Sequence, residues 1–118
     1  MTVTNIAREY IAAIYGGSAL GSPAYIAIDT GSQAWSNSTT GLTTESDRNL
    51  VSSIDLSTLQ QVTWTVDFNS VEMSGLSLKG FGLFPLSSEG KTHAGDGFAA
   101  LQFDGTEELQ IQISLNVI

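Results

Sequence analysis

The apolar residues near the start of the chain recur every three or four positions, which predicts an amphipathic helix over residues 5–15. Thr4 or Asn5 can cap its first turn with a side-chain oxygen, and Gly16 and Gly17 can end it. The apolar stripe of this helix has to be buried. We expect it either to pack on the domain's own sheet or to dock on a neighbouring subunit. The stripe comprises Val3, Ile6, Ala7, Tyr10, Ala13 and Ile14.

Alternation of apolar and polar residues predicts strands over much of the remaining chain. Ala24–Asp29 and Leu50–Asp55 are short strands, and Gln61–Phe68 is the clearest one. The last strand, Glu108–Val117, alternates strictly and carries no charge from Gln110 onward. An exposed edge of that kind invites pairing with other chains. We therefore expect this strand to be central in its sheet or covered.

A further strand is predicted over Ser74–Phe84, and its alternation changes phase in the middle. The apolar residues occupy even positions before Gly80 and odd positions after it. A change of phase at a glycine is typical of a β-bulge or a sharp bend. We expect this segment to be a core strand with a bulge or a change of packing partner at Gly80.

Glycine and small polar residues mark the connections. Gly95 and Gly97 predict a bend, and Asp104–Gly105 predicts a tight hairpin turn. The polar segment Thr30–Thr44 is too long for a simple turn. We expect either an ordered excursion pinned by Trp35 or a surface loop used for contacts.

These elements add up to one helix followed by about six closely spaced strands, without βαβ alternation. The pattern predicts a mainly β protein in a single domain, residues 1–118. Within it, an antiparallel β-sandwich of Greek-key or jelly-roll type is expected over about 23–118, after the amphipathic helix at about 5–15. A chain of 118 residues is long enough to bury one core.

Composition narrows the functional classes. Twelve acidic against four basic residues give a net charge of −8, which argues against binding nucleic acid or anionic lipid. The sequence has no signal-peptide pattern and no apolar run long enough for a membrane helix. The absence of cysteine excludes disulfides and thiolate metal sites. Charged residues make up only 14%, a composition that fits a surface facing other protein.

One short motif points to catalysis. Asp29-Thr30-Gly31 resembles the active-site signature of aspartic proteases, in which two carboxylates share a proton. A chain with a single motif would have to dimerise to supply the second carboxylate. The apolar pair and glycine that support the catalytic turn have a counterpart only around Phe81-Gly82, inside the predicted core strand. An aspartic protease through Asp29 is therefore the alternative hypothesis, and no enzyme is predicted.

Other chemistry-bearing residues are weaker signals. His93 is the only histidine, and we expect a loop residue without a catalytic role. The acidic residues lack the spacing of a calcium loop, so neither a metal nor a cofactor is predicted. Trp64 lies on an apolar strand position and is expected in the core. Trp35 is the one aromatic that could stack on a sugar, as in a carbohydrate-binding module.

Several segments together resemble small structural proteins of tailed bacteriophages, especially those of tail fibres and baseplates. Two positions depart from that pattern: Asp29 stands where Gly is usual, and Gly80 stands where an acid is usual. The resembling segments are Ile26–Gly31, Gly41–Arg48, Ser74–Phe84, Phe98–Ala100 and Glu108–Ile113.

The resemblance implies a non-enzymatic virion protein that docks on other virion proteins and forms a homo-oligomer within an assembly. A tail-fibre or baseplate role is expected, with a capsid decoration or cement protein as the alternative. Ile6, Tyr10, Ile14 and Trp35 are the candidate partner contacts. A host glycan at Trp35 is left open, and neither nucleic acid nor membrane is an expected partner.

Overall fold

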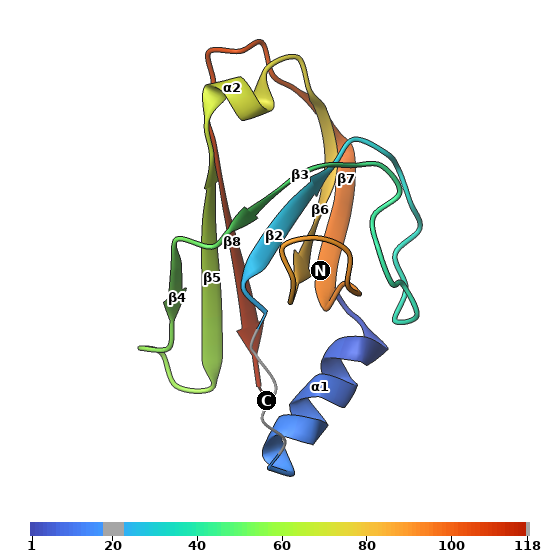
Figure 1. Ribbon diagram of the computed structural model, residues 1–118, viewed down its shortest axis with the longest axis vertical. Helices are drawn as coiled ribbons and strands as arrows, with labels where there is room; N and C mark the ends of the chain where they lie inside the picture. Colours follow the sequence, from blue (N-terminus) through green and yellow to red (C-terminus); the bar gives the residue numbers. More distant parts are fainter. Residues whose placement is uncertain (18–22, 118) are drawn as a thin grey trace.

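The computed structural model describes residues 1–17 and 23–117 and is mainly β, with two antiparallel sheets and a short N-terminal helix (Figure 1). Helix α1 spans Asn5–Tyr15, and a single-turn helix, α2, spans Ser70–Met73. The first sheet has five strands in the order β1 (Thr2–Val3), β7 (Ala94–Gln102), β6 (Ser77–Phe84), β2 (Tyr25–Asp29) and β3 (Glu45–Leu50). The second has the order β4 (Ser53–Asp55), β5 (Gln61–Phe68) and β8 (Leu109–Asn116). The predicted mainly β chain with an N-terminal helix is confirmed.

The hydrophobic core lies between the two sheets. The predicted alternation of β5 is confirmed, because Trp64, Val66 and Phe68 are buried while Asp67 is exposed. The Trp64 Nε1–H donates a hydrogen bond of 2.9 Å to the carbonyl of Pro23, which satisfies the polar atom of the buried ring. Each fully buried Ile, Leu, Val or Phe contributes about 1.5–3 kcal/mol. The core side chains from the other strands include Ile26, Ile28, Leu78 and Leu83 of the first sheet and Ile111 and Ile113 of β8.

Strand β6 has its irregularity where the alternation changes phase. Its pairing with β7 shifts register between Leu78 and Gly80, so an irregularity is present at the predicted place, but the two extra residues lie on β7, between Gly97 and Leu101. A Cβ atom at Gly80 would lie 2.8 Å from the carbonyl oxygen of Asp96, which explains the glycine. The strand begins at Ser77, later than predicted, because Gly75 adopts a φ of 72° in the turn after α2.

The chain crosses between the sheets at residues 51 and 52. The sequence predicted one strand over Leu50–Asp55, whereas β3 ends at Leu50 and β4 begins at Ser53 in the other sheet. The Val51 N–H donates to the carbonyl of Ala24 at 2.9 Å, and the Ser52 N–H donates to the carbonyl of Thr65 at 2.7 Å. Two successive amides therefore bond to different sheets, which is why a single strand was the wrong prediction.

The connection from β7 to β8 also differs from the prediction. Asp104–Gly105 forms a turn, but the two strands belong to different sheets, so the hairpin was wrong. The Phe103 N–H donates to the carbonyl of Leu76 at 3.0 Å, which keeps the end of β7 beside β6. The chain then crosses to the other sheet, where β8 pairs with β5 and turns its apolar face into the core.

Two further predictions about strands were wrong. Gly95 and Gly97 lie within the continuous strand β7 and make no break in it. Strand β8 pairs only with β5 in the described part of the chain, so the central position was wrong, and a cover on its other edge, the second arrangement expected, stays a prediction. Among the residues described, no helix has the length and apolar character needed to cross a bilayer.

Candidate functional site

Helix α1 is attached to the sandwich through its first turn. The Thr4 side chain is the N-cap and accepts a hydrogen bond from the Ala7 N–H, as predicted. The fully buried Thr4 hydroxyl also donates to the carbonyl of Thr92 at 2.7 Å, and the Thr4 N–H donates to the carbonyl of His93 at 3.0 Å. From this anchor the helix runs beyond one end of the two sheets (Figure 1).

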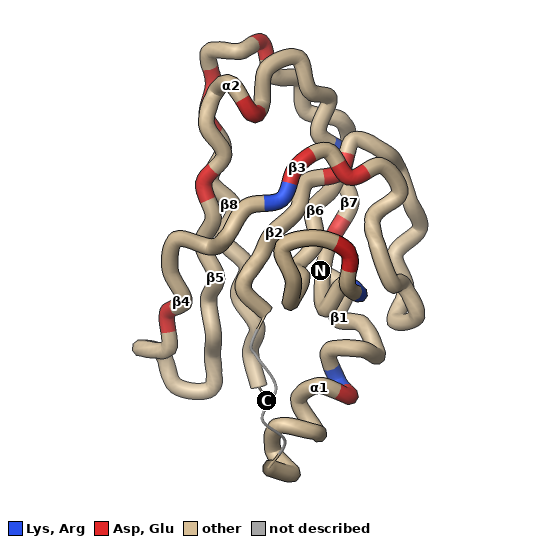
Figure 2. Tube along the Cα trace, in the orientation of Figure 1, with Lys and Arg blue, Asp and Glu red and all other residues tan. Residues whose placement is uncertain are grey.

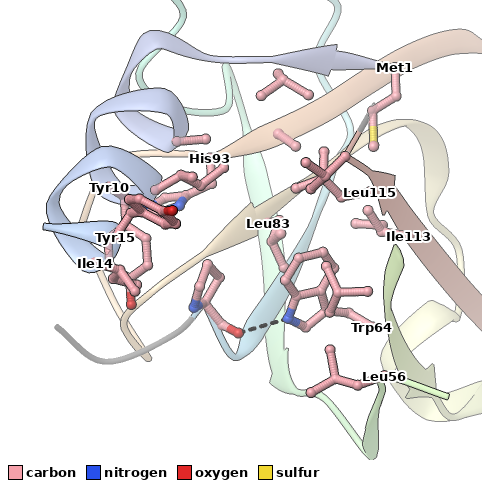
Figure 3. Close-up of a pocket in the computed structure, with 17 residues that line it drawn as sticks. Met1, Tyr10, Ile14, Tyr15, Leu56, Trp64, Leu83, His93, Ile113 and Leu115 are labelled. Atoms are coloured by element: carbon pink, nitrogen blue, oxygen red, sulfur yellow. Dashed lines mark hydrogen bonds between the residues drawn. The ribbon is translucent and has the colours of Figure 1, made fainter. Parts of the chain in front are cut away.

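A groove with a volume of about 460 Å³ lies between α1 and this end of the sandwich (Figure 3). Both sheets contribute to it: Trp64 from β5, Leu115 from β8 and Leu83 from β6. Tyr10 and Ile14 reach into it from the helix. Its lining is almost wholly apolar, and its volume lies in the range of sites that bind small molecules or partner side chains.

The rim of the groove is exposed. Ile14 is 43% exposed and Tyr15 is 95% exposed on α1, and Leu56 is 72% exposed on the opposite side. In the helix only Ala7 is fully buried. The predicted stripe thus faces the sandwich but is only partly covered by it.

Two polar side chains meet inside the groove. His93 is 4% exposed, and its ring packs edge-on against the ring of Tyr10 with centroids 4.9 Å apart. The Tyr10 hydroxyl is buried without a hydrogen-bond partner in the described part of the chain. Burial lowers the pKa of His93 and raises the pKa of Tyr10, so both groups are neutral near pH 7. The groove therefore offers neutral hydrogen-bonding groups in an apolar surface.

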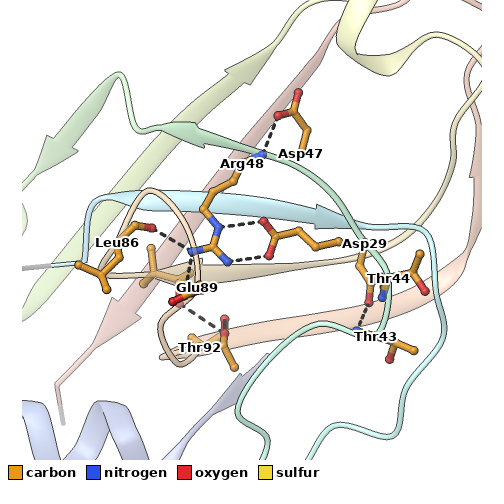
Figure 4. Close-up of polar contacts among 11 residues, drawn as sticks. Asp29, Thr43, Thr44, Asp47, Arg48, Leu86, Glu89 and Thr92 are labelled. Atoms are coloured by element: carbon orange, nitrogen blue, oxygen red, sulfur yellow. Dashed lines mark hydrogen bonds and ion pairs between the residues drawn. The ribbon is translucent and has the colours of Figure 1, made fainter.

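Asp29 lies far from this groove and has a structural environment. Its carboxylate is 1% exposed and accepts hydrogen bonds from the backbone N–H groups of Gly31 at 2.9 Å, Thr43 at 3.2 Å and Thr44 at 2.8 Å (Figure 4). These contacts join the two ends of the polar segment 30–44. This geometry suits a carboxylate that fixes a loop.

Trp35 packs on the outer face of the first sheet. Its ring is half-buried and lies over Gly95 and Gly97, where a side chain at Gly95 would collide with it. Segment 30–44 is thus an ordered excursion pinned by Trp35, one of the two arrangements expected. Trp35 also borders a hollow of about 260 Å³ together with Lys79 and Asp96.

The four predicted partner contacts fall in different places. Tyr10 and Ile14 line the groove, Ile6 is half-buried outside its lining, and Trp35 lies on the outer sheet face. His93 was expected in a loop without a role, and its burial against Tyr10 was missed. No local sequence pattern predicts the contact between Tyr10 and His93, because the two residues are 83 positions apart.

Arg48 holds a second polar cluster. Its guanidinium pairs with Glu45 and donates to the carbonyls of Leu86 at 2.9 Å and Glu89 at 2.6 Å (Figure 4). It also lies 3.8 Å from the centroid of the Phe84 ring. Glu45 and Arg48 lie three positions apart in β3, and a register shift opposite Asp29 brings both side chains to one face.

Charge is unevenly distributed along the molecule. Most acidic residues lie toward α2 and the loops beside it, whereas the end with the groove carries few charges (Figure 2). No protein-family model, curated protein or solved structure matches this chain. The fold and the groove are therefore the basis for the functional proposal.

Proposed function

We propose that the protein is a non-enzymatic structural component of a tailed-phage virion that docks on other virion subunits through the groove beside α1. The assignment to a virion rests on the resemblance of segments such as Gly41–Arg48 and Ser74–Phe84, and the docking is supported by the apolar groove with its exposed rim at Ile14, Tyr15 and Leu56. Exposed apolar surfaces of this kind mark interaction sites in soluble proteins. The low content of charged residues, 14%, fits a surface that faces other protein.

The occupant of the groove is an apolar segment of another virion subunit. Uncharged walls exclude an ionic ligand, because burying an unpaired charge there costs several kcal/mol. A partner segment with one hydrogen-bonding group satisfies the Tyr10 hydroxyl, which has no partner within the described residues. Tail-fibre or baseplate association is the proposed location, and capsid decoration is the alternative.

We also propose that the strands are connected in a Greek-key arrangement. After β5, the chain forms the β6–β7 pair in the opposite sheet and returns to place β8 beside β5. This return of a strand to its starting neighbour supports a Greek-key-like connection. A sandwich of that type presents its edges and ends to neighbours in an assembly.

The protease and glycan alternatives have less support. A catalytic Asp29 has to reach substrate, whereas its carboxylate is buried and bonded to three backbone N–H groups. One face of the Trp35 indole lies against Gly95 and Gly97, so at most its other face is left for stacking on a sugar. These contacts favour structural roles for both residues.

Particle fractionation tests the proposal. Phage particles separated into tails and capsids, analysed by mass spectrometry, should contain the protein at a fixed ratio in one fraction. Ile14→Asp places a charge at the groove rim and should abolish incorporation. Val71→Asp is the matched control, because Val71 is 82% exposed on α2, away from the groove, and its variant should be incorporated normally. Absence from every fraction, or equal incorporation of both variants, would contradict the proposal.

A further inference from the structure

Strand β8 has an open edge along its whole length. All eight residues pair with β5 on one side, and the sheet order β4-β5-β8 leaves the other side without a strand in the described part of the chain. At about 3.4 Å per residue this edge is about 27 Å long. Rows of unpaired backbone groups on such an edge are a template for another strand.

The hydrogen-bond pattern identifies the free backbone groups. The Val117 N–H donates to the carbonyl of Gln60 at 2.7 Å, and the register of β8 on β5 continues this pairing. In an antiparallel ladder successive residues direct their N–H and C=O groups to opposite sides. The odd residues of β8 therefore face β5, and the even residues face outward. The outward residues are Gln110, Gln112, Ser114 and Asn116, and all four are exposed.

The edge lacks the features that usually prevent pairing. Between Leu109 and Val117 there is no proline, glycine, lysine or other charged residue, and the register with β5 has no bulge. The other edges differ. Strand β4 has only three residues, and β3 carries Glu45, Asp47 and Arg48. Strand β7 is covered by β1 only at Ala94 and Gly95, but it carries Asp96 and Gly97 and its register with β6 is interrupted.

We infer that β8 pairs antiparallel with β8 of a second copy of this chain, around a two-fold axis at Ile113. The occupant is a strand, because a second strand supplies backbone partners for all the outward N–H and C=O groups of β8 at once. It also has to be uncharged and alternating, and β8 itself meets both conditions. Two chains of net charge −8 repel each other. Pairing through β8 places no like charges opposite one another, because this strand carries no charged residue.

The register follows from the positions of the free groups. Only the register with Gln112 opposite Ser114 and Gln110 opposite Asn116 gives all four outward residues a partner. It forms about eight backbone hydrogen bonds, two at each hydrogen-bonded pair. Ile113 then faces Ile113 of the second copy on the core side. The result is one continuous sheet of six strands across the dimer.

The polar side chains of β8 are already ordered by β5. The hydroxyl oxygens of Ser114 and Thr63 lie 2.8 Å apart, and the Gln61 amide donates to Asn116 Oδ1 at 2.9 Å. The Gln110 amide donates to Asp67 at 3.0 Å. Ordering these groups before association lowers the entropy cost of binding.

This inference goes beyond the proposed function, which concerns the groove, and names a contact for the homo-oligomer that the sequence resemblance implies. The isolated full-length protein is measured by size-exclusion chromatography with light scattering and should have twice the chain mass of 12.5 kDa. Gln112→Pro removes an outward N–H and should give the single-chain mass. The double variant Gln112→Lys with Ser114→Lys puts like charges opposite each other and should do the same. Ser53→Lys with Ser57→Lys adds the same charges at exposed positions in and just after β4, at the opposite edge of this sheet, and should remain dimeric.

Cross-linking tests the register without depending on strand disruption. The chain has no cysteine, so Gln112→Cys and Ser114→Cys can be made separately, tagged differently and mixed. Residues in a hydrogen-bonded pair have Cα atoms about 5.5 Å apart, within disulfide range. Mild oxidation should link the two variants to each other more than either to itself. A single-chain mass for the parent, or a dimer retained by both edge variants, would overturn the inference, while virion incorporation tests the proposed function separately.

Discussion

The rings of Tyr10 and His93 meet edge-on inside the apolar groove, with their centroids 4.9 Å apart. One ring comes from α1 and the other from the segment just before β7, so the contact holds the helix against the sandwich. Its geometry depends on a neutral imidazole, because a protonated ring in an apolar surface without a counter-charge is unfavourable. This makes the attachment of the helix sensitive to pH.

Lowering the pH should weaken the fold through His93. Burial lowers the pKa of His93 in the folded state relative to about 6.5 in an unfolded chain. The unfolded state therefore binds the proton more readily, and the stabilisation by the neutral ring, present above pH 6.5, is lost as the pH falls below it. Urea unfolding at pH 7.5 and 5.5 should show a larger loss for the parent than for His93→Phe. Equal losses would contradict this assignment.

Removing the Asp29 carboxylate should destabilise the protein, and we expect peptide cleavage neither by the parent nor by the variant. Asp29→Ala leaves three backbone N–H groups without their acceptor. Hydrogen bonds to a charged group are worth about 1.5–3 kcal/mol each, and relaxation of the loop recovers part of this, so we expect a net loss of about 3 kcal/mol. Asp29→Asn keeps one acceptor oxygen and should lose less. Peptide cleavage by the parent that is abolished in Asp29→Asn would support the protease alternative.

Adding a methyl group at Gly95 should be costly, whereas adding one at Gly97 should not. A Cβ at Gly95 collides with the Trp35 ring and with the carbonyl of Phe81, but the nearest atom to a Cβ at Gly97 is 3.5 Å away. Overpacking of this kind costs about 1–3 kcal/mol. Guanidinium unfolding monitored by tryptophan fluorescence compares the two variants. Equal stability of Gly95→Ala and Gly97→Ala would show that Trp35 does not pack there.

Replacing Arg48 with lysine should not preserve its contacts. The planar guanidinium pairs with both carboxylate oxygens of Glu45 while it donates to two carbonyls and stacks on Phe84. We expect Arg48→Lys to lower the free energy of unfolding by about 1–2 kcal/mol. Arg8→Lys is the control, because Arg8 is exposed and has only a side-chain bond to Asn5. A change at Arg8 as large as that at Arg48 would argue against this role.

Local patterns predicted the elements well where one segment carried its own signal. The helix from Asn5 to Tyr15 with its Thr4 cap, the alternation of β5 and the register shift at Gly80 are examples. Helix α2 was missed, although Asn69 and Glu72 form a capping box, because it is a single turn between two strands.

Features that depend on distant residues were not predictable from local patterns. Gly95 and Gly97 indicated a bend because nothing in the sequence places Trp35 over them. The position of β8 at an edge depends on which sheet each strand joins, and the alternation of apolar and polar residues gives no information about that. The groove was foreseen only as an apolar helix face, whereas its other walls come from residues in both sheets.

The crossing at Val51 and Ser52 has a consequence for hydrogen exchange. The Val51 amide is bonded to Ala24 in one sheet, and the next amide along the chain is bonded to Thr65 in the other. The two sheets cannot separate without opening one of these neighbouring amides. Their exchange with solvent deuterium should therefore occur at similar, slow rates, which reports the cooperative opening of both sheets as one unit.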